Sequence, residues 1–88
     1  MTEEAEYNIE NIHELEKRLN EINVPKDSYS ILKGGLPNDV CCIVKTDDSW
    51  EVYYSERGKK FRLKTFSKEG EACEYFFDMV EKGTRGYR

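Results

Sequence analysis

The side chains that carry out chemistry in enzymes are few in this sequence and lie far apart along it. His13 is the only histidine, and its neighbours favour a surface position over a role as a general base. Cys41 and Cys42 lie in an apolar run, which favours a core position, because a reactive thiolate needs a nearby base and an electropositive setting. Nothing near Cys73 in the sequence supplies such a base either. We therefore predict no catalytic residue and expect all three cysteines to be reduced.

Two short polar or glycine-rich segments could suggest a ligand site, but their spacing argues otherwise. Asp47-Asp48 lacks the regularly spaced oxygen ligands of a calcium loop, so a hairpin turn explains the pair. Gly34-Gly35 is not followed by the Gly-Lys-Ser/Thr sequence of a phosphate-binding loop and predicts a turn. We expect neither a metal ion nor a cofactor.

Length and composition favour one small folded domain. The chain has 88 residues, 38% of them hydrophobic and 12% aromatic, which is too aromatic for a disordered chain. We expect one domain over 1–88, with flexible ends at 1–7 and 83–88. No apolar run is long enough to span a membrane and the first residues are acidic, so we expect a cytoplasmic protein with no membrane contact.

Hydrophobic periodicity predicts a helix at each end and strands between them. Apolar residues at steps of three and four indicate a helix over 8–23, capped by Asn8 and stopped by Pro25. Alternating or continuous apolar runs indicate strands near 28–32, 40–44, 50–55 and 61–65. A second helix begins after Ser67 and ends at Gly83. The expected fold is α+β in the order α-β-β-β-β-α, a four-stranded antiparallel sheet with two helices packed on one face.

The strand near 50–55 is the most informative segment for function. If Trp50, Val52 and Tyr54 face the helices, the intervening residues project from the face that the helices leave uncovered. A tyrosine flanked by carboxylates suits a protein interface with a basic partner, although an open face that only meets water is the simpler alternative. The candidate partner-binding residues are Asp47, Asp48, Glu51, Tyr53, Ser55 and Glu56.

Several segments together resemble a known family. They are Gly34-Gly35-Leu36-Pro37, the stretch from Trp50 to Gly58, Phe66-Ser67 and the stretch from Glu71 to Phe76. With these segments the chain resembles the small immunity proteins of bacterial polymorphic toxin systems, most nearly immunity protein family 59. The resemblance implies a non-enzymatic protein that neutralises a cognate toxin encoded beside it, in contact-dependent inhibition or a related system. Such toxins are often basic nucleases, which agrees with a net charge of −4.

Basic residues gather in one segment and leave another function open. Between Arg57 and Lys68 no acidic residue interrupts the lysines and arginines. The alternative function is therefore a small nucleic-acid-binding regulatory domain that uses the strand at 59–66, with Phe61 and Phe66 between the cations. The overall negative charge disfavours a polyanion as the partner. A structural or adaptor domain is a third interpretation, and the sequence leaves the oligomeric state open.

Overall fold

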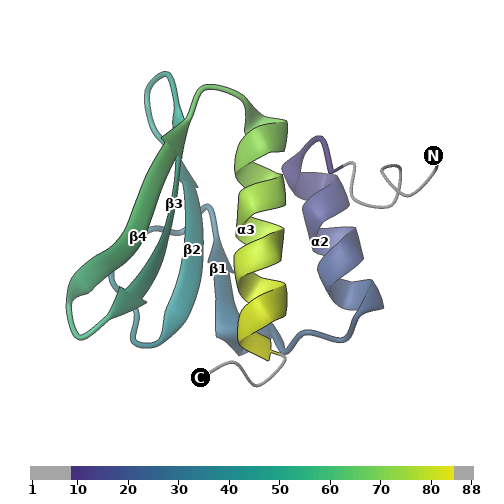
Figure 1. Cartoon of the computed structure of the whole chain (residues 1–88), viewed down its shortest axis with the longest axis horizontal. Coiled ribbons are helices and arrows are strands. Elements are labelled where there is room, and N and C mark those ends of the chain that lie inside the picture. The colour runs from purple at the N-terminus through teal and green to yellow at the C-terminus, as the bar shows by residue number, and fades with distance from the viewer. Residues whose placement is uncertain (1–8, 85–88) are drawn as a thin grey trace.

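The computed structural model describes residues 9–84 and contains the element order expected from the sequence. The helices are α2 (Ile12–Glu21) and α3 (Glu69–Thr84), with a short 3-10 helix, η1 (Lys26–Ser28), ahead of the sheet. The strands are β1 (Tyr29–Ile31), β2 (Val40–Lys45), β3 (Trp50–Glu56) and β4 (Lys59–Phe66). The α+β class and the α-β-β-β-β-α order are confirmed (Figure 1).

The sheet has the order β1-β2-β3-β4 and is mixed rather than antiparallel throughout. β2 pairs antiparallel with β3, and β3 with β4. β1 instead runs parallel to β2, with Tyr29 opposite Cys41 and Ile31 opposite Ile43. The expectation of an all-antiparallel sheet is therefore wrong at this one pair.

The segment 32–39 makes the parallel pairing possible. Parallel strands normally need a connection of about a dozen residues or more, because the chain must travel back along the sheet. β1 has only three residues, so the return distance is only about 10 Å. The backbone turns at left-handed positions, with φ of 66° at Leu32, 72° at Gly34, 80° at Gly35 and 60° at Asp39. The glycines accept this conformation without a side-chain clash.

The N-cap of helix α2 lies three residues later in the chain than expected. The cap is Asn11, whose side chain accepts a hydrogen bond from the Glu14 backbone N–H at 2.9 Å. The predicted cap, Asn8, lies outside the described residues. The Ile12 N–H, another free donor of the first turn, donates to Glu69 Oε2 at 2.9 Å. This bond ties the start of α2 to the start of α3.

Helix α3 starts close to the predicted position and includes the glycine expected to stop it. Its bounds, Glu69–Thr84, contain Gly83, so the helix runs through the first two residues of the predicted flexible end at 83–88. The other predicted flexible residues, 1–7 and 85–88, lie outside the described part of the chain.

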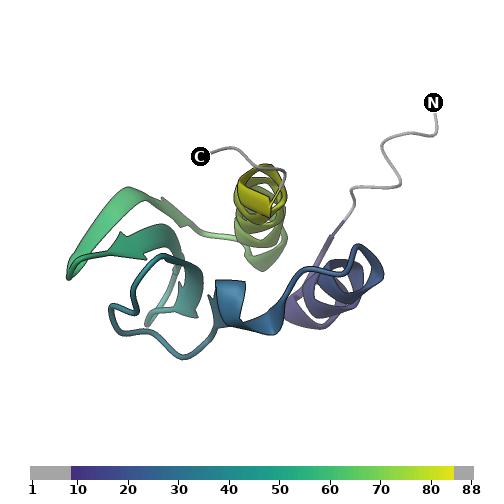
Figure 2. The ribbon, with the colours of Figure 1, turned by 90° about the horizontal axis from the view of Figure 1, so that it is seen from below.

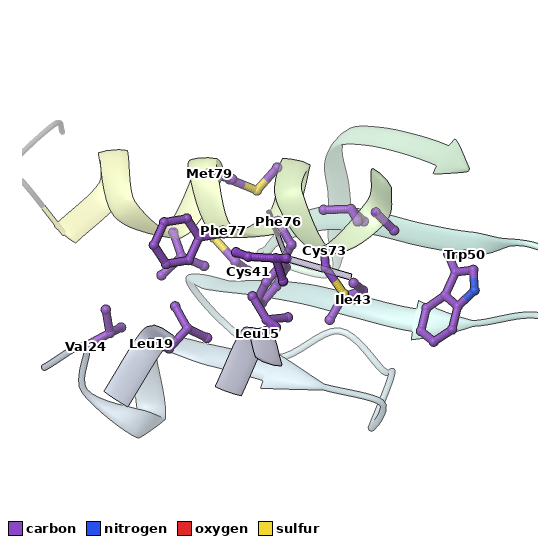
Figure 3. Packing of buried hydrophobic residues seen from close by; sticks show 14 residues of the cluster. Leu15, Leu19, Val24, Cys41, Ile43, Trp50, Cys73, Phe76, Phe77 and Met79 are labelled. Carbon is purple, nitrogen blue, oxygen red and sulfur yellow. The ribbon is translucent and has the colours of Figure 1, made fainter. Parts of the chain in front are cut away.

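Helix α3 covers one face of the sheet, whereas α2 lies beside β1 at the edge of the sheet (Figure 2). α3 packs on β2 and β3, and α2 packs against α3 on the side of β1 (Figures 1 and 2). Figure 3 shows the side chains between these layers. The buried cluster comprises Ile9, Leu15, Leu19, Val24, Cys41, Ile43, Trp50, Val52, Ala72, Cys73, Phe76, Phe77, Met79 and Val80. Trp50 and Val52 thus face the helices as the sequence predicts, and Tyr54 is partly buried beside them.

Replacing Trp50 with alanine should destabilise the fold strongly, because its side chain is only 8% exposed. A large-to-small change of this kind costs about 3–5 kcal/mol. Leu63→Ala is the matched control, since Leu63 is 49% exposed and its loss should change the free energy of unfolding by less than about 0.5 kcal/mol. Urea titration followed by circular dichroism measures both. Equal losses for the two variants would contradict this assignment of the core.

Candidate functional site

The second face of β3, expected to be open to solvent, is covered. Tyr53 is 1% exposed and Ser55 is 0% exposed, so the prediction that both project into water is wrong. The physical reason is the return segment 32–39. The Tyr53 hydroxyl donates a hydrogen bond of 2.8 Å to the backbone oxygen of Gly35 in this segment. Strand alternation assigned Tyr53 to the correct face, but it carried no information about what covers that face.

Lys60, on the neighbouring strand β4, covers part of the same face of β3. Its Nζ lies 4.6 Å from the centre of the Tyr53 ring and 3.4 Å from Glu51 Oε1. The ammonium group therefore makes a cation–π contact and an ion pair within the chain. Glu51, predicted to contact a partner, is half-buried and already paired.

The remaining predicted contact residues lie too far apart to form one site. Asp47 and Asp48 are exposed in the β2–β3 turn, where Thr46 and Ser49 hydrogen-bond to each other. Glu56 lies at the other end of β3, where its Oε2 is 4.0 Å from Arg57 Nε. A strand of seven residues is about 20 Å long, so the two acidic groups are separated by roughly that distance. The predicted acidic patch is therefore not a single surface.

The cysteines are free and buried. Burial raises the pKa of Cys41 to about 11 and that of Cys73 to about 12, so both thiols are protonated at neutral pH. Burial also raises the pKa of Cys42, partly offset by its hydrogen bond with Tyr53 and by the charge of Lys60. Cys73 lies on the inner side of α3 and is 0% exposed. Neutral thiols shielded from solvent are poor nucleophiles.

β4 is the most exposed strand, and the sequence pointed to it only as the surface of the alternative, nucleic-acid-binding function. Every residue from Lys59 to Thr65 is exposed, including Phe61 at 44% and Leu63 at 49%. Val52 of β3 pairs with Lys64 of β4, and Tyr54 pairs with Phe61. Between these two pairs β4 has one extra residue, so both Arg62 and Leu63 lie opposite Tyr53. Arg62 has a φ of 59°, as expected at a β-bulge. The visible signal in the sequence was the alternation of apolar and cationic residues, which equally fits a strand packed on one face.

A shallow groove lies between α2 and the outer side of β1. Its lining mixes both charges with apolar and amide side chains and includes Glu16, Asn20, Lys26, Tyr29, Ile31 and Lys33. The mixed lining gives no preference for a ligand of one charge.

Two further features bear on ligands and membranes. Within residues 9–84, no three His, Cys, Asp or Glu side chains are arranged to hold a metal ion. In the same part of the chain, no helix combines the length and the apolar character needed to cross a membrane.

Comparisons with known proteins leave the family open. No protein-family model matches the chain, and no curated protein or solved structure matches it either. The resemblance to immunity protein family 59 therefore remains a proposal, and the geometry above must carry the functional argument.

Tyr53→Phe should lower the free energy of unfolding by about 0.5–1.5 kcal/mol, because it removes the hydrogen bond from the Tyr53 hydroxyl to the Gly35 backbone oxygen. Ser55→Ala is the matched control on the same face. The Ser55 hydroxyl is buried without a partner among the described residues, so its removal should be neutral or stabilising. Chemical denaturation measures both variants. A Tyr53→Phe protein as stable as wild type would show that segment 32–39 is not held through this bond.

Stability should fall in alkaline solution. The pKa values of Cys41 and Cys73 are about 11 and about 12 in the folded chain, against an ordinary value of 9.0. Above about pH 9 the unfolded thiols lose protons that the folded thiols keep, so the unfolded state is favoured as pH rises. The urea concentration at the unfolding midpoint should be similar at about pH 7 and 9 and lower at about pH 10. In the Cys73→Ala variant this decrease should be smaller. A midpoint that stays constant over this range would refute the burial of the thiols.

Proposed function

We propose that the protein is a non-enzymatic immunity protein that binds a cognate protein toxin in the cytoplasm and neutralises it. The observation that carries the proposal is the exposed strand β4, where Phe61 and Leu63 stand in water between lysines and arginines. Aromatic residues and arginine are enriched in protein interfaces. Burial of these side chains by a partner would remove apolar surface that the chain itself leaves uncovered.

The motif behind the family resemblance has a structural role that supports this proposal. Tyr53 and Ser55 fill the second face of β3, and Arg57-Gly58 forms the two-residue turn into β4. Both turn residues have positive φ, 53° and 75°, which suits the type I′ hairpin. Asn38 Oδ1 accepts a hydrogen bond of 3.1 Å from the Arg57 N–H and holds the turn against segment 32–39. The motif therefore presents β4 to solvent.

The chemistry of the described residues also favours binding over catalysis. The thiols are buried and neutral at physiological pH. His13 is exposed on α2, and no nucleophile hydrogen-bonds to it within residues 9–84. A covalent mechanism needs a nucleophile and a base within hydrogen-bonding reach of each other.

A second candidate function is nucleic-acid binding through the strand 59–66. The specific observation in its favour is the exposure of Lys59, Arg62 and Phe61 along one strand. Phosphate contacts of this kind make binding steeply dependent on salt. The net charge of −4 opposes the approach of a polyanion.

The proposed function predicts protection against a toxin. Co-expression with the toxin domain encoded beside the gene should restore growth of a sensitive host, and calorimetry should show a complex in the nanomolar range, near −12 kcal/mol. The matched control is the toxin domain of an unrelated system, which should neither bind nor be neutralised. Absence of both protection and binding with the neighbouring toxin would refute the immunity function. Salt-sensitive binding of oligonucleotides together with that result would favour the second candidate.

A further inference from the structure

β4 forms a free edge of the sheet. It is the last strand in the order β1-β2-β3-β4, so one side of its backbone has no strand partner within residues 9–84. In Figure 1 it lies at the outer side of the sheet, far from α2, and its C-terminal end alone contacts α3. A strand of eight residues with an open edge offers hydrogen-bonding groups that an added strand can use.

Two cations on this edge are available to a partner. Lys60 is held by Glu51 and Tyr53, and Lys64 lies 5.7 Å from the Phe66 ring and 5.4 Å from the Tyr75 ring. The side chains of Lys59 and Arg62, in contrast, make no hydrogen bond or ion pair with any described residue.

The same features make a second copy of the chain a poor occupant. Two β4 strands side by side would bring like charges together, at a cost for each directly opposed pair. The bulge at Arg62 bends the edge, and a bent rigid edge cannot match another along its length. A flexible extended segment can follow the bend and supply carboxylates.

A protein segment fits this edge better than a nucleic acid. Strand addition uses the free backbone groups of β4, which a nucleic acid cannot pair in register. The exposed aliphatic side chain of Leu63 offers packing area but no stacking platform. Acidic residues on the outer sides of both helices, among them Glu14, Glu71 and Glu74, would repel a long polyanion more than a short peptide.

We propose that the free edge of β4 binds an extended acidic segment of a partner protein by strand addition. Lys59 and Arg62 pair with its carboxylates, while Phe61 and Leu63 pack against its apolar side chains. This inference rests on the proposed function only in naming the toxin as the protein that carries the segment. The sequence predicted a basic surface on the partner, contacting Glu51. Glu51 is instead paired with Lys60 in this chain, so we propose an acidic segment of the partner in its place.

The probe is a synthetic peptide of about ten residues in which glutamate alternates with valine, a length that covers one strand. Titration into the labelled full-length protein should shift the amide resonances of Lys59–Phe66 and slow their hydrogen exchange, with α2 unaffected. Two control probes have the same charge. One replaces every valine with proline, which cannot donate to a ladder, and the other is a thymidine oligonucleotide.

Matched variants test the role of charge. Lys59→Gln with Arg62→Gln should weaken peptide binding by about tenfold. Lys17→Gln with Lys33→Gln changes the net charge equally at exposed positions outside β4 and should leave binding unchanged. Four outcomes would each overturn the proposal. They are equal weakening of peptide binding by the two variant pairs, binding of the proline peptide as strong as that of the valine peptide, an absence of resonance shifts in β4, and binding of the oligonucleotide alone.

The same two double variants, titrated with the neighbouring toxin, separate this inference from the proposed function. If only the Lys59→Gln with Arg62→Gln variant binds the toxin more weakly, the result supports both the immunity function and strand addition at β4. Full-strength toxin binding by that variant overturns the toxin as the carrier of the acidic segment and leaves the immunity function standing. Peptide binding at β4 without any toxin binding overturns the immunity function and leaves strand addition standing.

Discussion

Because β1 runs parallel to β2, the chain between them must return along the sheet before β2 can begin. Residues 32–39 make that return across the face opposite the helices, and the backbone oxygen of Gly35 accepts the Tyr53 hydroxyl there. Both faces of β3 are therefore covered, one by α3 and the other by this segment. Tyr53, Ser55 and Cys42 are buried on the face that this segment and Lys60 cover.

Covering both faces of β3 moves the available surface to the edge of the sheet. The ammonium group of Lys60 lies over Tyr53 and pairs with Glu51, so the outer face of β3 is occupied by contacts within the chain. Among residues 9–84, β4 has a strand neighbour on one side only, and α3 lies mainly over β2 and β3. Phe61 and Leu63 of β4 consequently remain exposed to water, and they are flanked by cations of the kind that discourage self-association at a free edge.

The distribution of charge contributes little to stability. Ion pairs such as Lys82–Asp78 at 3.2 Å are exposed on the surface and contribute at most about 1 kcal/mol each. The acidic residues of the helices and the basic residues of β4 largely stay apart. Segregated charge of this kind steers the approach of a partner and selects its orientation.

The sequence by itself determined the element order and the facing of Trp50 and Val52, because hydrophobic periodicity is a local property. It did not determine the direction of β1, since a short strand carries the same pattern in either direction. Nor did it determine whether Tyr53 meets water. Alternation assigns side chains to a face, but only the tertiary structure decides what covers that face, and here the cover comes from residues about twenty positions earlier in the chain. The bulge at Arg62 escaped prediction for a similar reason, because it arises from the pairing of two strands and not from either strand alone.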